Sequence, residues 1–293
     1  MQELSLEKQK LLMLEILLDF DKVCRNNGIR YSLAYGTLLG AVRHQGFIPW
    51  DDDIDICMLR SDVDKLTAAL IDDPEYQITL VYDWFVKCRQ VRFCSTNSLI
   101  PCFVDISIYD RAAENSKRAN DQLRQLRIEL MDFFDKNERE FSFWKDNPWM
   151  VHPHSGLSVQ CGDVDLEAQR TVVSSAEIDL VQSVFDSFNE KAHDLGLLTD
   201  ESRGDFAYAI DNVFDAPKRK IIWDRNDILP VRKHPFDSFS FLVPAKAEKV
   251  ADDCYPGWPY MPMDICGHDH FAKDVLSDPD VRSAMAKFVD ECN

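Results

Sequence analysis

Residues 35–56 read Tyr35-Gly36-Thr37-Leu38-Leu39-Gly40-Ala41-Val42-Arg43-His44-Gln45-Gly46-Phe47-Ile48-Pro49-Trp50-Asp51-Asp52-Asp53-Ile54-Asp55-Ile56. Four carboxylates fall within five positions at the end of this stretch, next to apolar residues. Alternate residues of a β-strand share a face, so we expect Asp51, Asp53 and Asp55 to point one way and the isoleucines to point to the core. Three like charges on one face repel unless something neutralises them. The pattern therefore predicts a divalent cation bound through carboxylate oxygens.

A second feature lies upstream, where Gly36 and Thr37 precede two leucines and a glycine. This order predicts a strand that runs into a tight turn and then a short helix over residues 37–43. Exposed amides at such a helix start, with a threonine hydroxyl beside them, form an anion site. A phosphate site next to a metal cluster indicates phosphoryl-transfer chemistry.

Each feature also has a purely structural interpretation. A run of Asp is most often a solvated loop, and Gly-Thr after a strand is most often only a turn. The two features are separated by a short stretch that contains Arg43, His44 and a Pro49-Trp50 corner. Their combination favours a functional site over two unrelated turns.

The whole chain predicts one elaborated α/β domain over residues 1–293, with a core over 28–112 and helical, aromatic-rich additions over 113–293. Strands are expected over residues 29–35, 51–58, 76–82, 85–93 and 103–110. Helices are expected over residues 5–25, with Ser5 as the cap, and over 61–70, 112–140 and 174–195. Residues 144–162 contain several prolines and glycines, which predict a loop.

The composition narrows the class of function. A net charge of −18 argues against binding to nucleic acid or to an anionic membrane surface, because both need basic surface. No apolar run approaches the roughly 20 residues of a transmembrane helix. The first residues lack the basic start and small-residue cleavage site of a signal peptide, so we expect a cytoplasmic protein. The nine cysteines form no Cys-x-x-Cys pair and are expected to be reduced thiols.

Two further strands carry charged candidates. In residues 103–110, Asp105 stands alone between apolar neighbours, where it is either a strand-end cap or a third carboxylate for the cluster. The predicted strand 85–93 carries Lys87, Arg89 and Arg92. Such charges usually form a solvated strand face. Beside a metal and phosphate site, Lys87 and either arginine could instead neutralise a diphosphate.

Aromatic residues near the C-terminus offer a possible wall for an organic head group. Trp258 and Tyr260, together with Trp50, could surround a quaternary ammonium such as choline. The alternative is that they only pack the last elements of the fold. The sequence predicts no role for four loop histidines, which are His152, His154, His268 and His270.

The stretch from Tyr35 to Ile56 closely resembles the signature of the LicD family. These are bacterial phosphocholine transferases of the nucleotidyltransferase superfamily, related to fukutin-type ribitol-phosphate transferases. The superfamily uses a Gly-Gly or Gly-Ser turn, a strand with two alternating acids, and a third acid on a neighbouring strand. Here these correspond to Gly36-Thr37, to Asp53 with Asp55, and to Asp105, with Thr in place of Gly or Ser as in the LicD branch. The C-terminal resemblance is looser.

The resemblance implies a nucleotidyltransferase-like core with a mixed β-sheet, flanking helices and a helical C-terminal elaboration. It implies transfer of a phospho-head-group, such as phosphocholine or a polyol phosphate, from CDP-choline or a CDP-polyol. The acceptor would be a hydroxyl of a glycan or glycolipid in cell-surface polysaccharide or lipopolysaccharide biosynthesis. Such a protein would work at the cytosolic face of the membrane where glycans are assembled.

The resemblance also implies roles for individual residues. Asp53 and Asp55 would hold Mg²⁺ or Mn²⁺, and Asp105 would complete the metal site or take the proton of the acceptor hydroxyl. Asp51 could support a second ion. The residues expected to contact the donor phosphates are Gly36, Thr37, Arg43, Lys87 and Arg92.

Two other functions stay open at this point. A nucleotidyltransferase would transfer the nucleotide half of the donor to a protein or a small molecule. A ligand-binding relative would have lost catalysis, although the presence of all three candidate acids counts against it.

Overall fold

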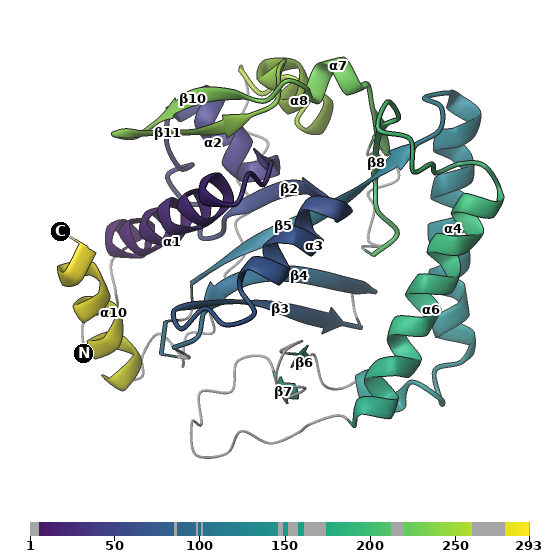
Figure 1. Cartoon of the computed structure of the whole chain (residues 1–293), viewed down its shortest axis with the longest axis horizontal. Helices are drawn as coiled ribbons and strands as arrows, with labels where there is room; N and C mark the ends of the chain where they lie inside the picture. Colours follow the sequence, from purple (N-terminus) through teal and green to yellow (C-terminus); the bar gives the residue numbers. More distant parts are fainter. Residues whose placement is uncertain are drawn as a thin grey trace.

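A computed structural model describes residues 6–84, 87–97, 99–100, 102–145, 149–151, 158–160, 174–211, 220–259 and 279–292. Over these residues the chain has a mixed α/β fold, in which helices flank one sheet (Figure 1). Nine strands of the described part join this sheet, and seven of them follow the order β1-β2-β5-β4-β3-β6-β7. They are β1 (Ser32–Leu33), β2 (Asp55–Leu59), β3 (Tyr76–Asp83), β4 (Cys88–Ser95), β5 (Phe103–Ala112), β6 (Trp149–Val151), β7 (Ser158–Gln160), β8 (Asp205–Tyr208) and β9 (Ile222–Trp223).

Strand β5 is the centre of the sheet. β2 runs parallel to it along one side, with Tyr109 opposite Leu59 and Ile106 opposite Ile56. On the other side, Ile106 pairs with antiparallel β4, whereas Tyr109 pairs with antiparallel β8. β4 and β8 therefore share one side of β5, one after the other, and the sheet forks between them.

The main core lies between the sheet and the N-terminal helices. α1 (Leu6–Asn26) and α3 (Arg60–Ala69) cover the face of the sheet that is turned to the viewer in Figure 1. The buried side chains of α1 recur at helical spacing and are Leu12, Met13, Ile16, Leu17, Phe20 and Cys24. Alternate residues of β2, β5 and β4 meet them, among them Ile56, Ile106 and Phe93. This alternation leaves the opposite face of the same strands for polar residues.

A second core cluster joins α4 (Lys117–Lys136) to α6 (Ser175–Asp194), which stand side by side at the right of Figure 1. Phe134 of α4 and Phe185 of α6 pack with Trp144, which lies in the short helix α5 (Ser142–Lys145). Arg127 of α4 is fully buried and donates hydrogen bonds to the carbonyl groups of Tyr208 and Ala209, at the end of β8. The helix pair is therefore tied to the far end of the sheet.

The later elements pack around α2 (Tyr35–His44) and α1. A hairpin of β10 (Arg232–Phe236) and β11 (Phe239–Val243) pairs its two strands antiparallel and contacts β1. α7 (Arg225–Ile228) leads toward this hairpin, and α8 (Ala247–Cys254) packs on both α7 and α2. α10 (Pro279–Cys292) contacts α1. None of the helices in the described part has the length and apolar character needed to span a membrane.

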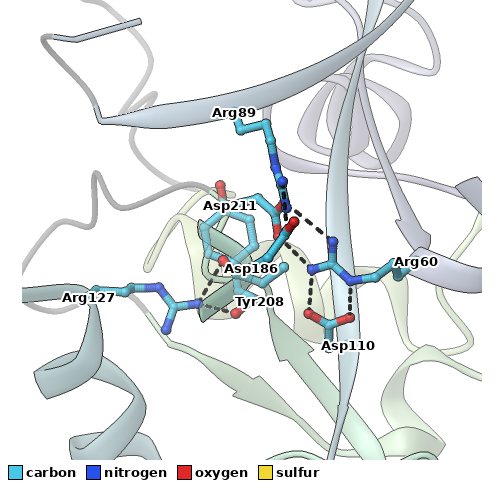
Figure 2. Close-up of polar contacts among 8 residues, drawn as sticks. Arg60, Arg89, Asp110, Arg127, Asp186, Tyr208 and Asp211 are labelled. Atoms are coloured by element: carbon cyan, nitrogen blue, oxygen red, sulfur yellow. Dashed lines mark hydrogen bonds and ion pairs between the residues drawn. The ribbon is translucent and has the colours of Figure 1, made fainter. Parts of the chain in front are cut away.

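A network of ion pairs around the buried Asp211 lies at the fork between β4 and β8 (Figure 2). Arg60, directly after β2, binds both carboxylate oxygens of Asp110 at 2.7 Å and also binds Asp211. Arg89 of β4 donates to the same Asp211 at 2.8 and 2.6 Å, and to Asp186 of α6 at 2.9 Å. Burial alone would raise the pKa of Asp211, but Arg89 and Arg60 outweigh it and lower that pKa. The carboxylate of Asp211 is therefore ionised at neutral pH.

Most expected elements are confirmed, with revised ends. α3, the β3–β4 hairpin, β5 and α6 lie where the sequence pattern predicts them. Ser174 caps α6 with a full capping box. Gly28 and Gly196 follow α1 and α6 with positive φ, which ends each helix in the left-handed region. The expected cap Ser5 lies outside the described residues.

Four boundaries differ from the prediction. The expected strand over 29–35 is reduced to β1, because the chain already enters α2 at Tyr35. The expected strand over 51–58 begins only at Asp55, so Asp51 and Asp53 precede it in irregular backbone. The expected helix over 112–140 is shorter, because β5 continues to Ala112 to pair with β8. The expected loop over 144–162 contains the short strands β6 and β7.

Gly40 is expected to be intolerant of a side chain. A Cβ at this position would lie 2.5 Å from the carbonyl oxygen of Gly46 and 3.1 Å from the amide nitrogen of Ile48. Alanine favours a helix over glycine by about 1 kcal/mol, whereas forcing atoms into a packed contact costs about 1–3 kcal/mol. We therefore expect Gly40→Ala to lower the free energy of unfolding, measured by urea denaturation. A more stable variant would show that α2 and the loop after it are not in this contact.

Candidate functional site

The start of α2 is joined directly to the acidic segment. The amide nitrogen of Asp55 donates to the hydroxyl of Thr37 at 2.8 Å, and the amide nitrogen of Gly36 donates to the carboxylate of Asp55 at 3.3 Å. Gly36 also faces Asp51, since a Cβ at Gly36 would lie 3.0 Å from an oxygen of that carboxylate. The predicted turn and the predicted acids therefore meet in space.

The neighbouring strands bring two more charged groups to the same place. Asp55 of β2 is the register partner of Asp105 on β5, and Asp105 is the register partner of Arg92 on β4. Partners in register point to the same face of a sheet, and this face is opposite to the one covered by α1 and α3. Arg92 forms an ion pair with Asp105 at 2.7 Å and lies 3.7 Å above the ring of Phe103.

Four carboxylates act on one another here. The pKa of Asp55 is raised well above its usual range, first by burial and then by the charges of Asp53, Asp105 and Asp51, while the amide of Gly36 acts in the opposite direction. Asp53 and Asp51 thus lie near Asp55 although they precede the strand. Their position does not depend on the strand alternation that the sequence pattern predicts.

A divalent cation such as Mg²⁺ requires several oxygen ligands around one position. In the described part of the chain, no three His, Cys, Asp or Glu side chains are arranged to ligate one ion as they stand. The available ligands are carboxylate oxygens, which Mg²⁺ and Mn²⁺ prefer. Burial is the first cause of the raised pKa of Asp55, and the charges of Asp53, Asp105 and Asp51, which a cation would offset, raise it further. The donor set therefore fits such an ion chemically.

The described residues include two further predicted donor-binding residues, Arg43 and Lys87. Arg43 lies in the last turn of α2, at the end opposite to Gly36, where its Nε contacts the ring of His44 at 2.9 Å. Lys87 is buried just before β4 rather than on the strand. Its amine donates to the carbonyl of Trp84 at 2.8 Å and lies 3.2 Å from a carboxylate oxygen of Asp135.

The two candidate arginines of β4 are separated by the structure. Arg92 faces Asp105 at the acidic cluster, whereas Arg89 belongs to the network at the fork. The ion pair with Asp105 places Arg92 at the cluster.

The predicted aromatic wall is only partly described. Trp50 directly precedes Asp51 and is 41% exposed. Trp258 is half-buried and packs against the main core, close after the end of α8. Tyr260 lies outside the described residues, as do the four loop histidines His152, His154, His268 and His270.

Sequence reasoning missed a pair of tyrosines on the site face. The hydroxyl groups of Tyr35 and Tyr109 lie 3.2 Å apart. Tyr109 follows Asp105 by four residues on β5, so the period-2 pattern of that strand could have placed it on the same face. Cys57 is the register partner of Ser107 on the same strand, and burial and Cys254 raise the pKa of its thiol to about 12, so the thiol stays protonated at neutral pH.

Comparison with known proteins agrees with this geometry. Residues 28–158 match the family model described as LicD/FKTN/FKRP, nucleotidyltransferase domain. Residues 28–158 are therefore similar to the LicD family and are called the LicD-family segment below. The LicD-family segment holds all the candidate acids together with Gly36, Thr37 and Arg92.

Individual relatives support the LicD assignment. The lipopolysaccharide cholinephosphotransferase LicD of Haemophilus influenzae is 35% identical over 129 residues, which are 40% of this chain and 49% of that protein. Uncharacterised proteins of Rickettsia prowazekii and Rickettsia typhi are 38% and 46% identical over 76 and 56 residues. These segments cover 26% and 19% of this chain, and 29% and 18% of those proteins. The chain thus matches about half of the first relative's length and less of the other two.

Thr37→Val is expected to destabilise the LicD-family segment. The hydroxyl of Thr37 is fully buried and accepts from the amide of Asp55, so its loss leaves a buried donor without its acceptor. Such a loss costs about 1–3 kcal/mol. Thr37→Ser keeps the hydroxyl and is the matched control. Equal free energies of unfolding for the wild type and Thr37→Val, measured by urea denaturation, would contradict this role.

Proposed function

We propose that this protein transfers a phospho-head-group from a CDP-linked donor to a hydroxyl group of a glycan. The head group is phosphocholine or a polyol phosphate, and the acceptor is a cell-surface glycan or glycolipid. The LicD-family match and the name of the Haemophilus influenzae relative support this reaction class and an acceptor of the lipopolysaccharide type.

One observation carries the proposal. Asp55 and Asp105 are register partners on adjacent parallel strands, at the point where the start of α2 meets Asp51 and Asp55. Placing two carboxylates side by side is unfavourable without a positive partner. Such a cluster next to the amide of Gly36 suits a metal-bound diphosphate.

Asp53, Asp55 and Asp105 would hold Mg²⁺ or Mn²⁺, with Asp51 as a further ligand. Bound there, the ion would supply positive charge to the diphosphate as negative charge develops on the departing nucleotide. Arg92 would share this task from the side of Asp105. Asp105, once positioned by Arg92, is also the candidate base for the proton of the acceptor hydroxyl.

We do not assign Thr37 and Lys87 to the donor site, whereas Arg43 stays a candidate contact for the donor phosphates. The hydroxyl of Thr37 supports the backbone of Asp55, and the side chain of Lys87 contacts Trp84 and Asp135. The amide of Gly36 stays a candidate contact for phosphate, because it already points to the carboxylate of Asp55.

Replacing single acids should abolish transfer. We expect Asp53→Asn, Asp55→Asn and Asp105→Asn each to lower kcat by about two orders of magnitude or more. Asp52→Asn, in the same acidic run, is the matched control and should keep activity. The assay follows CDP-choline labelled separately in the choline and in the cytidine half. Label from choline on the acceptor supports the proposal, whereas label from cytidine would show nucleotidyl transfer instead.

Metal binding can be measured without activity. We expect Mg²⁺ or Mn²⁺ to raise the melting temperature of the wild type and not that of Asp55→Asn, because binding to the folded state stabilises it. Without metal, Asp55→Asn should melt above the wild type, since it removes a buried charge among like charges. A wild type that does not respond to either ion would contradict the metal assignment.

The head-group wall gives a separate prediction. If Trp258 contacts a choline group, Trp258→Leu should weaken binding of CDP-choline by about 1–2 kcal/mol through loss of the cation–π interaction. The affinity for CDP should be unchanged, as measured by calorimetry. Equal loss for both ligands would mean that Trp258, which packs on the main core, only supports the fold.

A further inference from the structure

Because the sheet forks, few backbone hydrogen bonds hold together the strands that carry the acidic cluster. Three charged groups of the cluster lie on paired strands of the sheet. Asp55 lies on β2, Asp105 on β5 and Arg92 on β4. β4 pairs with β5 only from Val91 to Cys94. Beyond this point β8 takes the place of β4 beside β5. Backbone pairing therefore holds the relevant part of β4 to β5 over four residues only.

The ion network lies where this pairing stops. Leu59 is opposite Tyr109, so Arg60 and Asp110 are the next residues along the paired strands β2 and β5. Their guanidinium and carboxylate groups form a two-point contact, which fixes orientation as well as distance. Arg89 brings β4 into the same network three residues before Arg92.

Asp211 is the shared member of the network. Its carboxylate binds both Arg60 and Arg89, and its carbonyl accepts from the amide of Arg89 at 2.6 Å. The side chain of Asp211 is 6% exposed, and that of Arg89 is 13% exposed. Buried charges of this kind are strongly coupled, because removing one partner leaves the others uncompensated.

The carboxylates that complete the network come from beyond the LicD-family segment. Arg60, Arg89 and Asp110 lie within residues 28–158, whereas Asp186 and Asp211 follow it. The family segment alone provides two cations and one anion to the fork. The later part of the chain supplies the negative charge that balances them.

We propose that Asp211, through Arg60 and Arg89, is a positioning residue that sets the spacing of β2, β5 and β4 and thereby the arrangement of Asp55, Asp105 and Arg92. The network lies about five residues, or roughly 17 Å, along β2 and β5 from these acids. It acts by fixing the strands and does not touch a substrate. The inference rests on the proposed function for its catalytic consequence only.

The test compares Asp211→Asn with a matched variant. Asp227 is also a buried carboxylate with two cationic partners, Lys246 and Lys249, but it joins α7 to α8 and none of the site strands. Amide hydrogen exchange is measured on the full chain of the wild type, Asp211→Asn and Asp227→Asn. For Asp211→Asn we expect exchange over residues 51–59, 88–95 and 103–108 to accelerate by about tenfold or more, relative to residues 6–26. For Asp227→Asn these segments should exchange as in the wild type.

A milder variant covers the case in which Asp211→Asn does not fold. Arg89→Lys keeps the charge but loses the forked contact with Asp211 and Asp186. It should accelerate exchange in the same three segments by a smaller factor. If the variant that folds leaves these segments unchanged relative to Asp227→Asn, the positioning role is overturned.

Activity provides a separate outcome. If phospho-head-group transfer is the function, Asp211→Asn should lower kcat by about tenfold or more and change the KM for the donor little, since small misplacements of reacting groups mainly slow the chemical step. Asp227→Asn should keep kcat. Faster exchange in the site strands of a protein whose wild type shows no transfer would support the positioning role and refute the proposed function.

Discussion

The parallel pairing of β2 with β5 places the carboxylates of Asp55 and Asp105 on neighbouring strands at the same level. Two like charges in this position repel each other, and neighbouring groups offset part of this repulsion. Arg92 on the next strand pairs with Asp105, and the amide of Gly36 at the start of α2 donates to Asp55. The arginine on β4 and the start of α2 therefore offset part of the repulsion that this pairing creates.

The sheet provides this arrangement because one of its faces is apolar and the other carries the charged residues. Alternate residues of β2 and β5 pack on α1 and α3, which fixes the strands through burial of apolar side chains. The residues between them are then presented on the other face. Because the same alternation serves both purposes, shifting either strand by one residue would move Asp55 or Asp105 into the core.

Much of this could be predicted from local patterns. Asp55 and Asp105 stand next to buried isoleucines, so strand periodicity alone placed them on a polar face. Gly36 and Thr37 were also correctly placed next to the acids. The role of Thr37 was not predictable, because a hydroxyl that binds phosphate and one that binds the amide of Asp55 have the same sequence context.

Long-range contacts explain the remaining differences. Lys87 and Arg92 look equivalent in sequence, but the first is buried against α4 through Asp135 and the second faces Asp105. Asp110 binds Arg60 across the parallel pair, a contact that its local sequence does not indicate. Asp211 carried no signal at all, since its partners lie 151 and 122 residues away in the chain.

The position of β8 has a consequence for how this family domain exists in the cell. Residues 109–112 of β5 find their hydrogen-bonding partners in β8, which lies outside residues 28–158, the segment that matches the family model. Without β8, that half of the central strand would be an open sheet edge with unpaired backbone groups, and such edges recruit other chains and aggregate. During synthesis, this edge of the sheet therefore stays open and prone to aggregation until residues 205–208 have been synthesised, well after the acids.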